Sequence, residues 1–243
     1  MFSAIPMPRV EWNDKNMRYA LCAFPLVGLA AGILMALWVW LSLLLGLPGL
    51  LRAAGLTAIP VLLTGGIHLD GYADTQDALA SHRSPAERQE ILKDPHTGAF
   101  AVIRLCLYFL LSFALWGSLR GYPPLKIALM LLLSRSLSGL AVAAFPLARG
   151  SGLAYTFHQA ADKRKVAWML GVLSVLLGLG LCLRGLPGVL MALGAAGTFG
   201  YYHRMARKQF GGLSGDLAGW FLQTAELIML LALCLGQYLE VLI

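Results

Sequence analysis

Three aspartates stand at regular spacing directly after an apolar stretch. In the segment HLDGYADTQD, Asp70, Asp74 and Asp77 occupy positions i, i+4 and i+7. If the segment is helical, at about 100° per residue, the three carboxylates fall within an arc of about 60°. Carboxylates on one face repel each other, and a hard divalent cation such as Mg²⁺, held together with substrate phosphates, is the usual compensating partner. The spacing therefore indicates a magnesium–phosphate site. The alternative is a solvated helix start, for which one aspartate would be typical.

A second group of candidates lies in the segment ILKDPHTGAFAV. Asp94 precedes a proline, at a turn that leads into the next apolar run. We expect Asp94 to complete the metal site or to act as a base, although Asp-Pro is also a common turn dipeptide. Lys93 and His96, on either side of it, are candidates to contact a phosphate.

The remaining candidates lie in or beside apolar runs, where ionisable residues are costly and point to function. Asp216 begins the last run, in GGLSGDLAGWFLQTAEL, and Gln223 follows seven residues later on nearly the same helical face. Glu226 lies deeper in the same run and needs a partner. We expect it to belong to the functional site, and the alternative is a structural interhelical hydrogen bond to a protonated Glu. Arg135 lies inside another run and Arg149 follows that run; such arginines need an anion, either one of these acids or a phosphate.

Composition indicates that membrane helices position these residues. Of the 243 residues, 58% are hydrophobic and only 13% are charged, whereas soluble domains have about 25% charged residues. A transmembrane helix needs about 20 apolar residues. We expect an all-α, polytopic integral membrane helical bundle of about seven transmembrane helices, forming a single domain over residues 1–243. The second and sixth runs are short, which leaves six or eight open. The seven runs are 20–47, 50–66, 99–119, 123–145, 166–183, 186–200 and 218–239.

The basic residues predict the orientation of this bundle. Thirteen of the nineteen Lys and Arg residues fall in loops 1–18, 68–98, 147–165 and 201–217, which contain three, three, four and three of them. Because Lys and Arg are enriched in cytoplasmic loops, we expect these loops, and with them the active site, to face the cytoplasm. Charge spread over alternate loops also differs from the clustered patch of a nucleic-acid-binding protein, so we expect no nucleic-acid partner.

Three classes of membrane protein fit these residues. The first is a metal-dependent phosphotransferase with a diphosphate-linked donor, and the second is a prenyl transferase, whose aspartates also hold Mg²⁺-diphosphate. The residues alone do not separate these two. The third class is an ion-coupled transporter. It is disfavoured because the acids, Glu226 excepted, lie at the ends of the apolar runs.

The segments GGIHLDGYADTQDAL, ILKDPHTGAFAV, LSRSLSGLAV, FPLARGSGLAYTF and GGLSGDLAGWFLQTAEL resemble the cobalamin synthase family, also called adenosylcobinamide-GDP ribazoletransferases. The resemblance extends from about residue 2 to residue 230. It implies adenosylcobinamide-GDP as donor, α-ribazole or its 5′-phosphate as acceptor, and adenosylcobalamin or its 5′-phosphate and GMP as products, in a late step of cobalamin biosynthesis.

The resemblance also implies a Mg²⁺ requirement and a place in the bacterial cytoplasmic (inner) membrane. Asp70, Asp74 and Asp77 would be metal ligands around the diphosphate. His68, which begins the same motif, would orient a carboxylate or touch the donor phosphate. The residues leave open which carboxylate is the base, which lower base the ribazole carries, and whether the chain forms a homo-oligomer.

Overall fold

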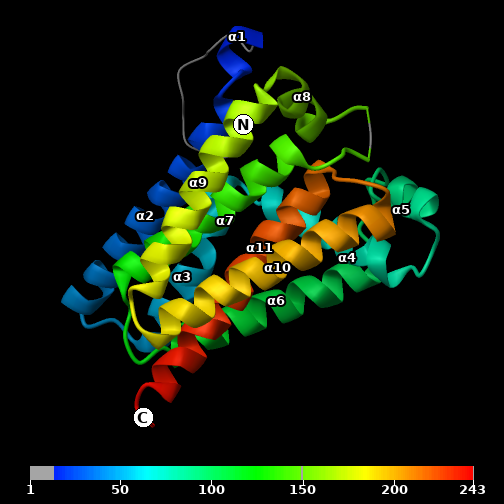
Figure 1. Ribbon diagram of the computed structural model, residues 1–243. Coiled ribbons are helices and arrows are strands. Elements are labelled where there is room, and N and C mark those ends of the chain that lie inside the picture. Colours follow the sequence, from blue (N-terminus) through cyan, green and yellow to red (C-terminus); the bar gives the residue numbers. More distant parts are fainter. Residues whose placement is uncertain (1–13, 149, 243) are drawn as a thin grey trace.

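The computed structural model describes residues 14–148 and 150–242 and is a bundle of helices (Figure 1). Within these residues no strand forms, and a single parallel bridge joins Leu147 to Leu213. The predicted all-α membrane bundle is therefore confirmed. Its helices are α1 (Asp14–Met17), α2 (Phe24–Leu44), α3 (Gly49–Thr64), α4 (Ile67–Ala80), α5 (Pro85–Ile91), α6 (Ala99–Ser118), α7 (Pro124–Ala144), α8 (Leu153–Ala160), α9 (Lys163–Cys182), α10 (Leu186–Phe210) and α11 (Gly215–Leu239), with the 3₁₀ turn η1 (Ala20–Ala23) before α2.

Each of the seven predicted apolar runs forms a helix. Among the described residues, five helices are long and apolar enough to cross a membrane, namely α2 with η1, α6, α7, α9 and α11. Helices α3 and α4 pass the same test only as one bent span, which raises the number to six. Helix α10, 25 residues long, packs beside α11 and α9 but is not among the candidate spans. A seventh span at α10 stays a prediction.

The break between α3 and α4 is made by two glycines. Gly65 and Gly66 both adopt left-handed backbone conformations, with φ of 66° and 81°, and the helices meet at 95°. A methyl group added at either glycine would meet no described atom within 4 Å, so close packing does not explain them. Positive φ is what requires glycine here. The bend turns α4, with its aspartates, across the bundle.

Helix α4 crosses α11 at two further glycines. A methyl group at Gly71 would lie 2.7 Å from the carbonyl oxygen of Asp216, and one at Gly219 would lie 2.8 Å from that of His68. The two backbones touch because neither glycine has a side chain. Each glycine thus packs against a candidate site residue of the other helix, which brings Asp70 and Asp216 together.

We expect Gly71→Ala to destabilise the protein by about 1–3 kcal/mol, the usual cost of forcing a methyl group into a packed interface. Gly171→Ala in α9 is the matched control, because its methyl group would meet no described atom within 4 Å. Thermal unfolding in detergent measures both. Equal unfolding temperatures for the two variants would contradict this account of the crossing.

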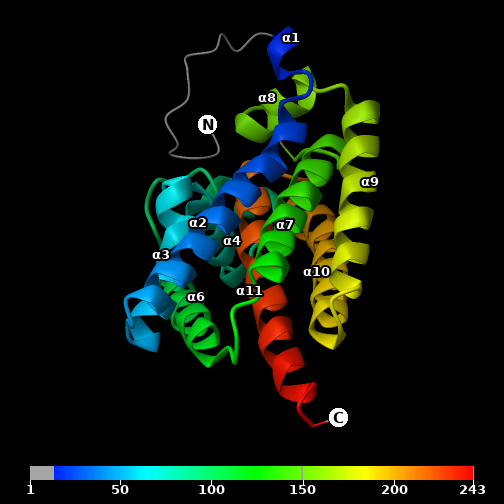
Figure 2. The same cartoon turned by 90° about the vertical axis from the view of Figure 1, so that its left-hand side faces the viewer.

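The connections of the bundle differ at its two ends. The C-terminus and the short α2–α3, α6–α7 and α9–α10 connections lie at one end, and α1 and α8 lie at the other (Figures 1 and 2). Longer polar segments containing α5 and α8 join α4 to α6 and α7 to α9. The end with α8 therefore holds the polar segments in which the sequence predicts the site.

Candidate active site

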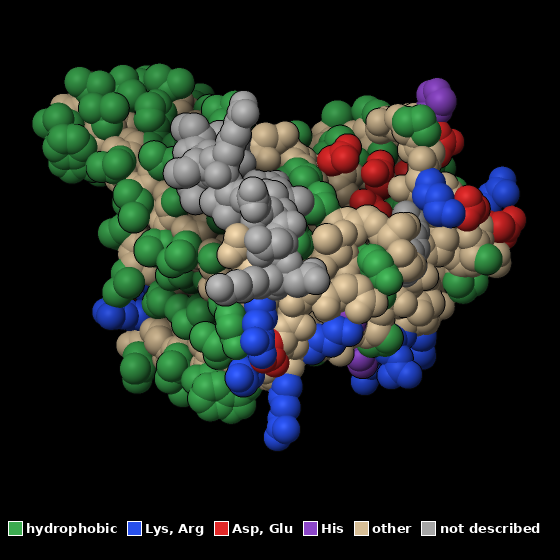
Figure 3. Space-filling view, turned by 90° about the horizontal axis from the view of Figure 1, so that it is seen from above, with side chains coloured by type: hydrophobic (Ala, Val, Ile, Leu, Met, Phe, Trp, Pro, Cys, Tyr) green, Lys and Arg blue, Asp and Glu red, His purple; other side chains and the backbone are tan. Residues whose placement is uncertain are grey.

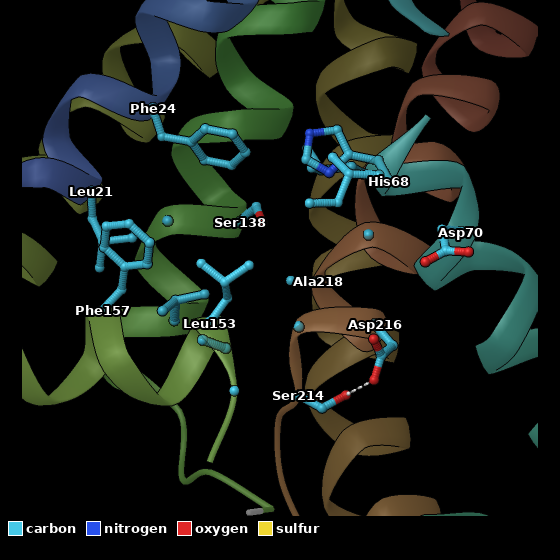
Figure 4. Close-up of a pocket in the computed structure, with 18 of the residues that line it drawn as sticks. Leu21, Phe24, His68, Asp70, Ser138, Leu153, Phe157, Ser214, Asp216 and Ala218 are labelled. Atoms are coloured by element: carbon cyan, nitrogen blue, oxygen red, sulfur yellow. Dashed lines mark hydrogen bonds between the residues drawn. The ribbon is translucent and has the colours of Figure 1, made fainter. Parts of the chain in front are cut away.

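A cavity of about 360 Å³ opens among α2, α4, α7, α8 and α11 (Figure 4). Its polar lining comes from His68 and Asp70 of α4, Ser138 of α7, Ser151 before α8, and Ser214 and Asp216 at the start of α11. The rest of its lining is largely apolar. Segments that are far apart in the sequence therefore meet at one site, at the end of the bundle that has the long connections.

Among the described residues, Asp70 and Asp216 are the two carboxylates in the cavity lining, and they face it from crossing helices. Ser214 is the N-cap of α11, where its hydroxyl accepts from the backbone N–H of Leu217 at 3.3 Å and donates to Asp216 Oδ2 at 3.3 Å. The strand-like bridge between Leu147 and Leu213 holds the backbone just before this cap, with Leu213 N donating to the carbonyl oxygen of Pro146 at 2.8 Å. Asp216 is thus oriented by the local structure at the helix start.

Asp74 and Asp77 continue the acidic face of α4 beyond the cavity. Asp70, Asp77 and Asp216 all lie close enough to repel the Asp74 carboxylate. The predicted helix and the shared face are therefore confirmed, and Asp216 joins them from α11. The carboxylate of Asp77 lies against Gly98, where a methyl group would come within 2.2 Å of Oδ2. Gly98 precedes the first turn of α6, whose dipole favours a negative charge there.

These carboxylates fit a cation that arrives with a phosphate ligand better than a preassembled metal centre. In residues 14–148 and 150–242, no group of three or more His, Cys, Asp or Glu side chains is arranged to hold a metal ion by itself. Mg²⁺ is commonly held by one or two carboxylates, with phosphate oxygens completing the shell. Asp70 and Asp216 at the cavity, with Asp74 beside them, supply carboxylates of this kind.

The Lys93–His96 segment lies outside the cavity. Asp94 Oδ1 accepts from the backbone N–H of His96 at 2.9 Å and is 2.7 Å from His96 Nδ1, and Lys93 Nζ pairs with Glu90 at 2.7 Å. The hydrogen bonds from His96, first that of its backbone, lower the pKa of Asp94, which makes it a weaker base. All three side chains are exposed, and their roles toward metal or phosphate stay predictions.

Arg135 and Glu226 form an ion pair inside the bundle. Arg135 Nη1 of α7 contacts Glu226 Oε1 of α11, and Ser134 donates to the same oxygen at 2.7 Å. Only 1% of Arg135 and 7% of Glu226 is exposed. The sequence left open whether Arg135 pairs with an acidic side chain or a phosphate, and in the structure it pairs with Glu226. The partner of Glu226 is therefore a cation, rather than the interhelical hydrogen bond to a protonated Glu that was the alternative.

Gln223 does not line the cavity. It is buried and accepts a hydrogen bond from the hydroxyl of Tyr108 in α6. Gln223 lies two turns after Asp216 on nearly the same side of α11, at a level where that side contacts α6. Its role toward the substrate stays a prediction. Arg149 lies outside the described residues.

Several cavity residues carry no signal that we read from the sequence. Ser214 has one in retrospect, because a serine before a helical apolar run is a typical N-cap. Helix α8 contributes Leu153 and Phe157, and His158 Nδ1 lies 2.7 Å from the carbonyl oxygen of Val142, which fixes α8 to α7. A helix of eight residues has too few periods to be predicted from its apolar pattern.

Charge is unevenly distributed over the face that holds the site. Seen from this end, acidic side chains gather in one region, and most Lys and Arg side chains lie elsewhere around the rim (Figure 3). An acidic region does not by itself attract a diphosphate. It can accept one when a divalent cation screens the charge.

Comparison with known proteins identifies the family. The family model described as Cobalamin-5-phosphate synthase matches residues 1–234. An adenosylcobinamide-GDP ribazoletransferase of Lachnoclostridium phytofermentans is 45% identical over 238 residues, covering 98% of this chain and 91% of that protein. One of Desulfitobacterium hafniense is 37% identical, covering 93% and 91%, and one of Geobacillus kaustophilus is 33% identical, covering 94% and 90%. No solved structure matches the chain. The whole-length match shows that this chain belongs to the cobalamin-5-phosphate synthase family.

Proposed function

We propose that this chain is an adenosylcobinamide-GDP ribazoletransferase of the cytoplasmic membrane. It transfers adenosylcobinamide phosphate to a ribose hydroxyl of α-ribazole, or of its 5′-phosphate, and releases GMP. Relatives with this name match nearly the whole chain. The observation that carries the proposal is the pair of carboxylates, Asp70 and Asp216, which face one cavity from two crossing helices.

The acidic residues of the site would bind the donor. Asp70, Asp74 and Asp216 would hold a Mg²⁺ ion together with the diphosphate end of the donor. When bound, that cation neutralises the diphosphate and stabilises the leaving GMP. The acceptor hydroxyl forms a bond to the phosphorus on the corrinoid side, while the bond from that phosphorus to GMP breaks. A carboxylate of the cavity takes the proton of the hydroxyl.

One product assay tests the proposal. The protein, purified in detergent, receives adenosylcobinamide-GDP and α-ribazole 5′-phosphate, with Mg²⁺ or with a chelator. We expect GMP and adenosylcobalamin 5′-phosphate only when Mg²⁺ is present. An ion-coupled transporter would give no product without a sealed vesicle, and a prenyl transferase would release no GMP. Product formation in chelator would refute the Mg²⁺ requirement alone.

We further propose that the site faces the cytoplasm. This proposal is supported by the sequence, in which the long loops that contain α5 and α8 are rich in Lys and Arg, as cytoplasmic loops are. Topology reporters fused after Arg120 and after Arg184, in the short connections, should therefore give extracytoplasmic signals. Cytoplasmic signals at both positions would reverse the orientation.

A further inference from the structure

A second cavity, of about 220 Å³, lies at the end of the bundle away from the active site. It is formed by α2 and by the segment that joins α6 to α7 and begins α7, and these parts lie at the end with the short connections (Figure 2). Its lining is largely apolar and includes Ala36, Trp40 and Leu43 of α2 and Tyr122 before α7. Trp40 is 61% exposed and Leu43 is 57% exposed, so the cavity borders the surface that meets lipid.

Arg52 of α3 lies beside this cavity with a fixed side chain. Its guanidinium carbon is 5.4 Å from the centroid of the Tyr122 ring, a cation–π contact. Its Nε atom donates to Ser42 Oγ at 2.7 Å, and its Nη2 atom donates to the carbonyl oxygen of Leu47 at 3.2 Å. Among the described residues Arg52 has no carboxylate partner, and its Nη1 atom makes no hydrogen bond. A guanidinium held in this way is prepared to bind an anion.

The charge at this end is not explained by the usual bias of membrane loops. Basic residues are enriched in cytoplasmic loops, whereas in the orientation proposed above this end is extracytoplasmic. The sequence nevertheless places one acid here, Glu240, against four basic residues, which are Arg52, Arg120, Lys126 and Arg184. The surplus of positive charge favours an anion from outside the chain.

We infer that this cavity and Arg52 together bind an anionic phospholipid, with part of one acyl chain in the cavity and the phosphate on the guanidinium. A volume of about 220 Å³ is below the range of small-ligand sites, about 300–1,000 Å³, and suits a segment of a chain. An empty apolar space forfeits dispersion contacts, which a chain restores. Arg52 lies in the first turn of α3, at the end of the bundle, where lipid phosphates are within reach. The inference is independent of the proposed function.

Lipid binding to the protein in detergent, followed by native mass spectrometry, tests the phosphate contact. Phosphatidylglycerol is compared with diacylglycerol of the same chains, which lacks the phosphate. We expect a Kd about tenfold lower for phosphatidylglycerol, and similar Kd values for the two lipids in Arg52→Gln. Arg120→Gln is the matched control, because Arg120 lies over Tyr238 instead, and it should keep the preference. No preference in the unaltered protein, or an undiminished preference in Arg52→Gln, would overturn the inference.

A second variant tests the acyl chain and leaves Arg52 in place, in case Arg52→Gln does not fold. Ala36→Phe places a ring in the cavity and should weaken phosphatidylglycerol binding about tenfold. Leu37→Phe is its control, since Leu37 is 53% exposed and does not line the cavity. Glycerol 3-phosphate, which has the anion without the chains, should not compete with the lipid. Equal Kd values for the two variants, or full competition by glycerol 3-phosphate, would overturn the inference.

Discussion

Asp216→Asn is expected to lower the rate of GMP release by about 100-fold to 1,000-fold, the range seen when one electrostatic contact to a developing charge is removed. The amide keeps the shape of the carboxylate but loses its negative charge, and with it most of its capacity to hold a cation. The backbone of Asp216, which packs on Gly71, is unchanged. The variant should therefore insert and unfold as the unaltered protein does. Steady-state assays over a range of Mg²⁺ concentrations measure the effect.

Asp162→Asn is the matched control, since it makes the same chemical change outside the cavity. Asp162 precedes α9 and accepts a hydrogen bond of 2.9 Å from Arg18, which lowers the pKa of its carboxyl. Its turnover should stay close to that of the unaltered protein. Full activity in Asp216→Asn, or an equal loss in the control, would reject the assignment of Asp216.

Asp74→Asn is expected to lower the rate of GMP release to a similar extent as Asp216→Asn, because Asp74 lies beside Asp70 and Asp216 on the same acidic face. Asp94→Asn gives separate information. No atom of Asp94 lines the cavity, so a comparable loss would mean that the segment 92–98 closes over the substrate. A normal rate would confine the catalytic carboxylates to α4 and α11.

The local features of the site could be predicted from the sequence because they depend on local geometry. Spacing of i, i+4 and i+7 places Asp70, Asp74 and Asp77 on one face of any helix, and α4 is a helix. The start of α5 also depends on local sequence, because the residues S-P-A-E form a capping box between Ser84 and Glu87. We did not predict that helix.

The contacts between helices could not be predicted in this way. The approach of Asp216 to α4 depends on Gly71 and Gly219 meeting at one crossing, and a glycine in a membrane helix does not specify its partner. Helical periodicity placed Gln223 near Asp216 but did not indicate that Tyr108 of α6 would bond it. The partner of Arg135 remained open for the same reason, since an acid and a phosphate satisfy the same guanidinium.

The second large effect is expected at the buried ion pair of Arg135 and Glu226 and concerns the free energy of unfolding. Glu226→Leu leaves Arg135 charged and buried without its carboxylate, and we expect a loss of about 3–5 kcal/mol in the free energy of unfolding. The double variant Arg135→Met/Glu226→Leu removes both charges and should recover most of that loss, because apolar residues of similar volume often replace a buried pair without penalty. Thermal unfolding in detergent measures all three proteins. A double variant no more stable than Glu226→Leu would contradict the pairing.

Turnover of the double variant then decides between a structural and a substrate-binding role for the pair. Neither Arg135 nor Glu226 lines the cavity, and the pair joins α7 to α11 deeper in the bundle. If its role is to hold those helices together, a stable double variant should keep its KM for both substrates. If Arg135 instead exchanges Glu226 for a phosphate during the reaction, the double variant should be stable yet have a raised KM for the donor. Measured together, stability and KM separate these two roles. A single substitution at either residue would not, because it destabilises the protein and removes a charge at once.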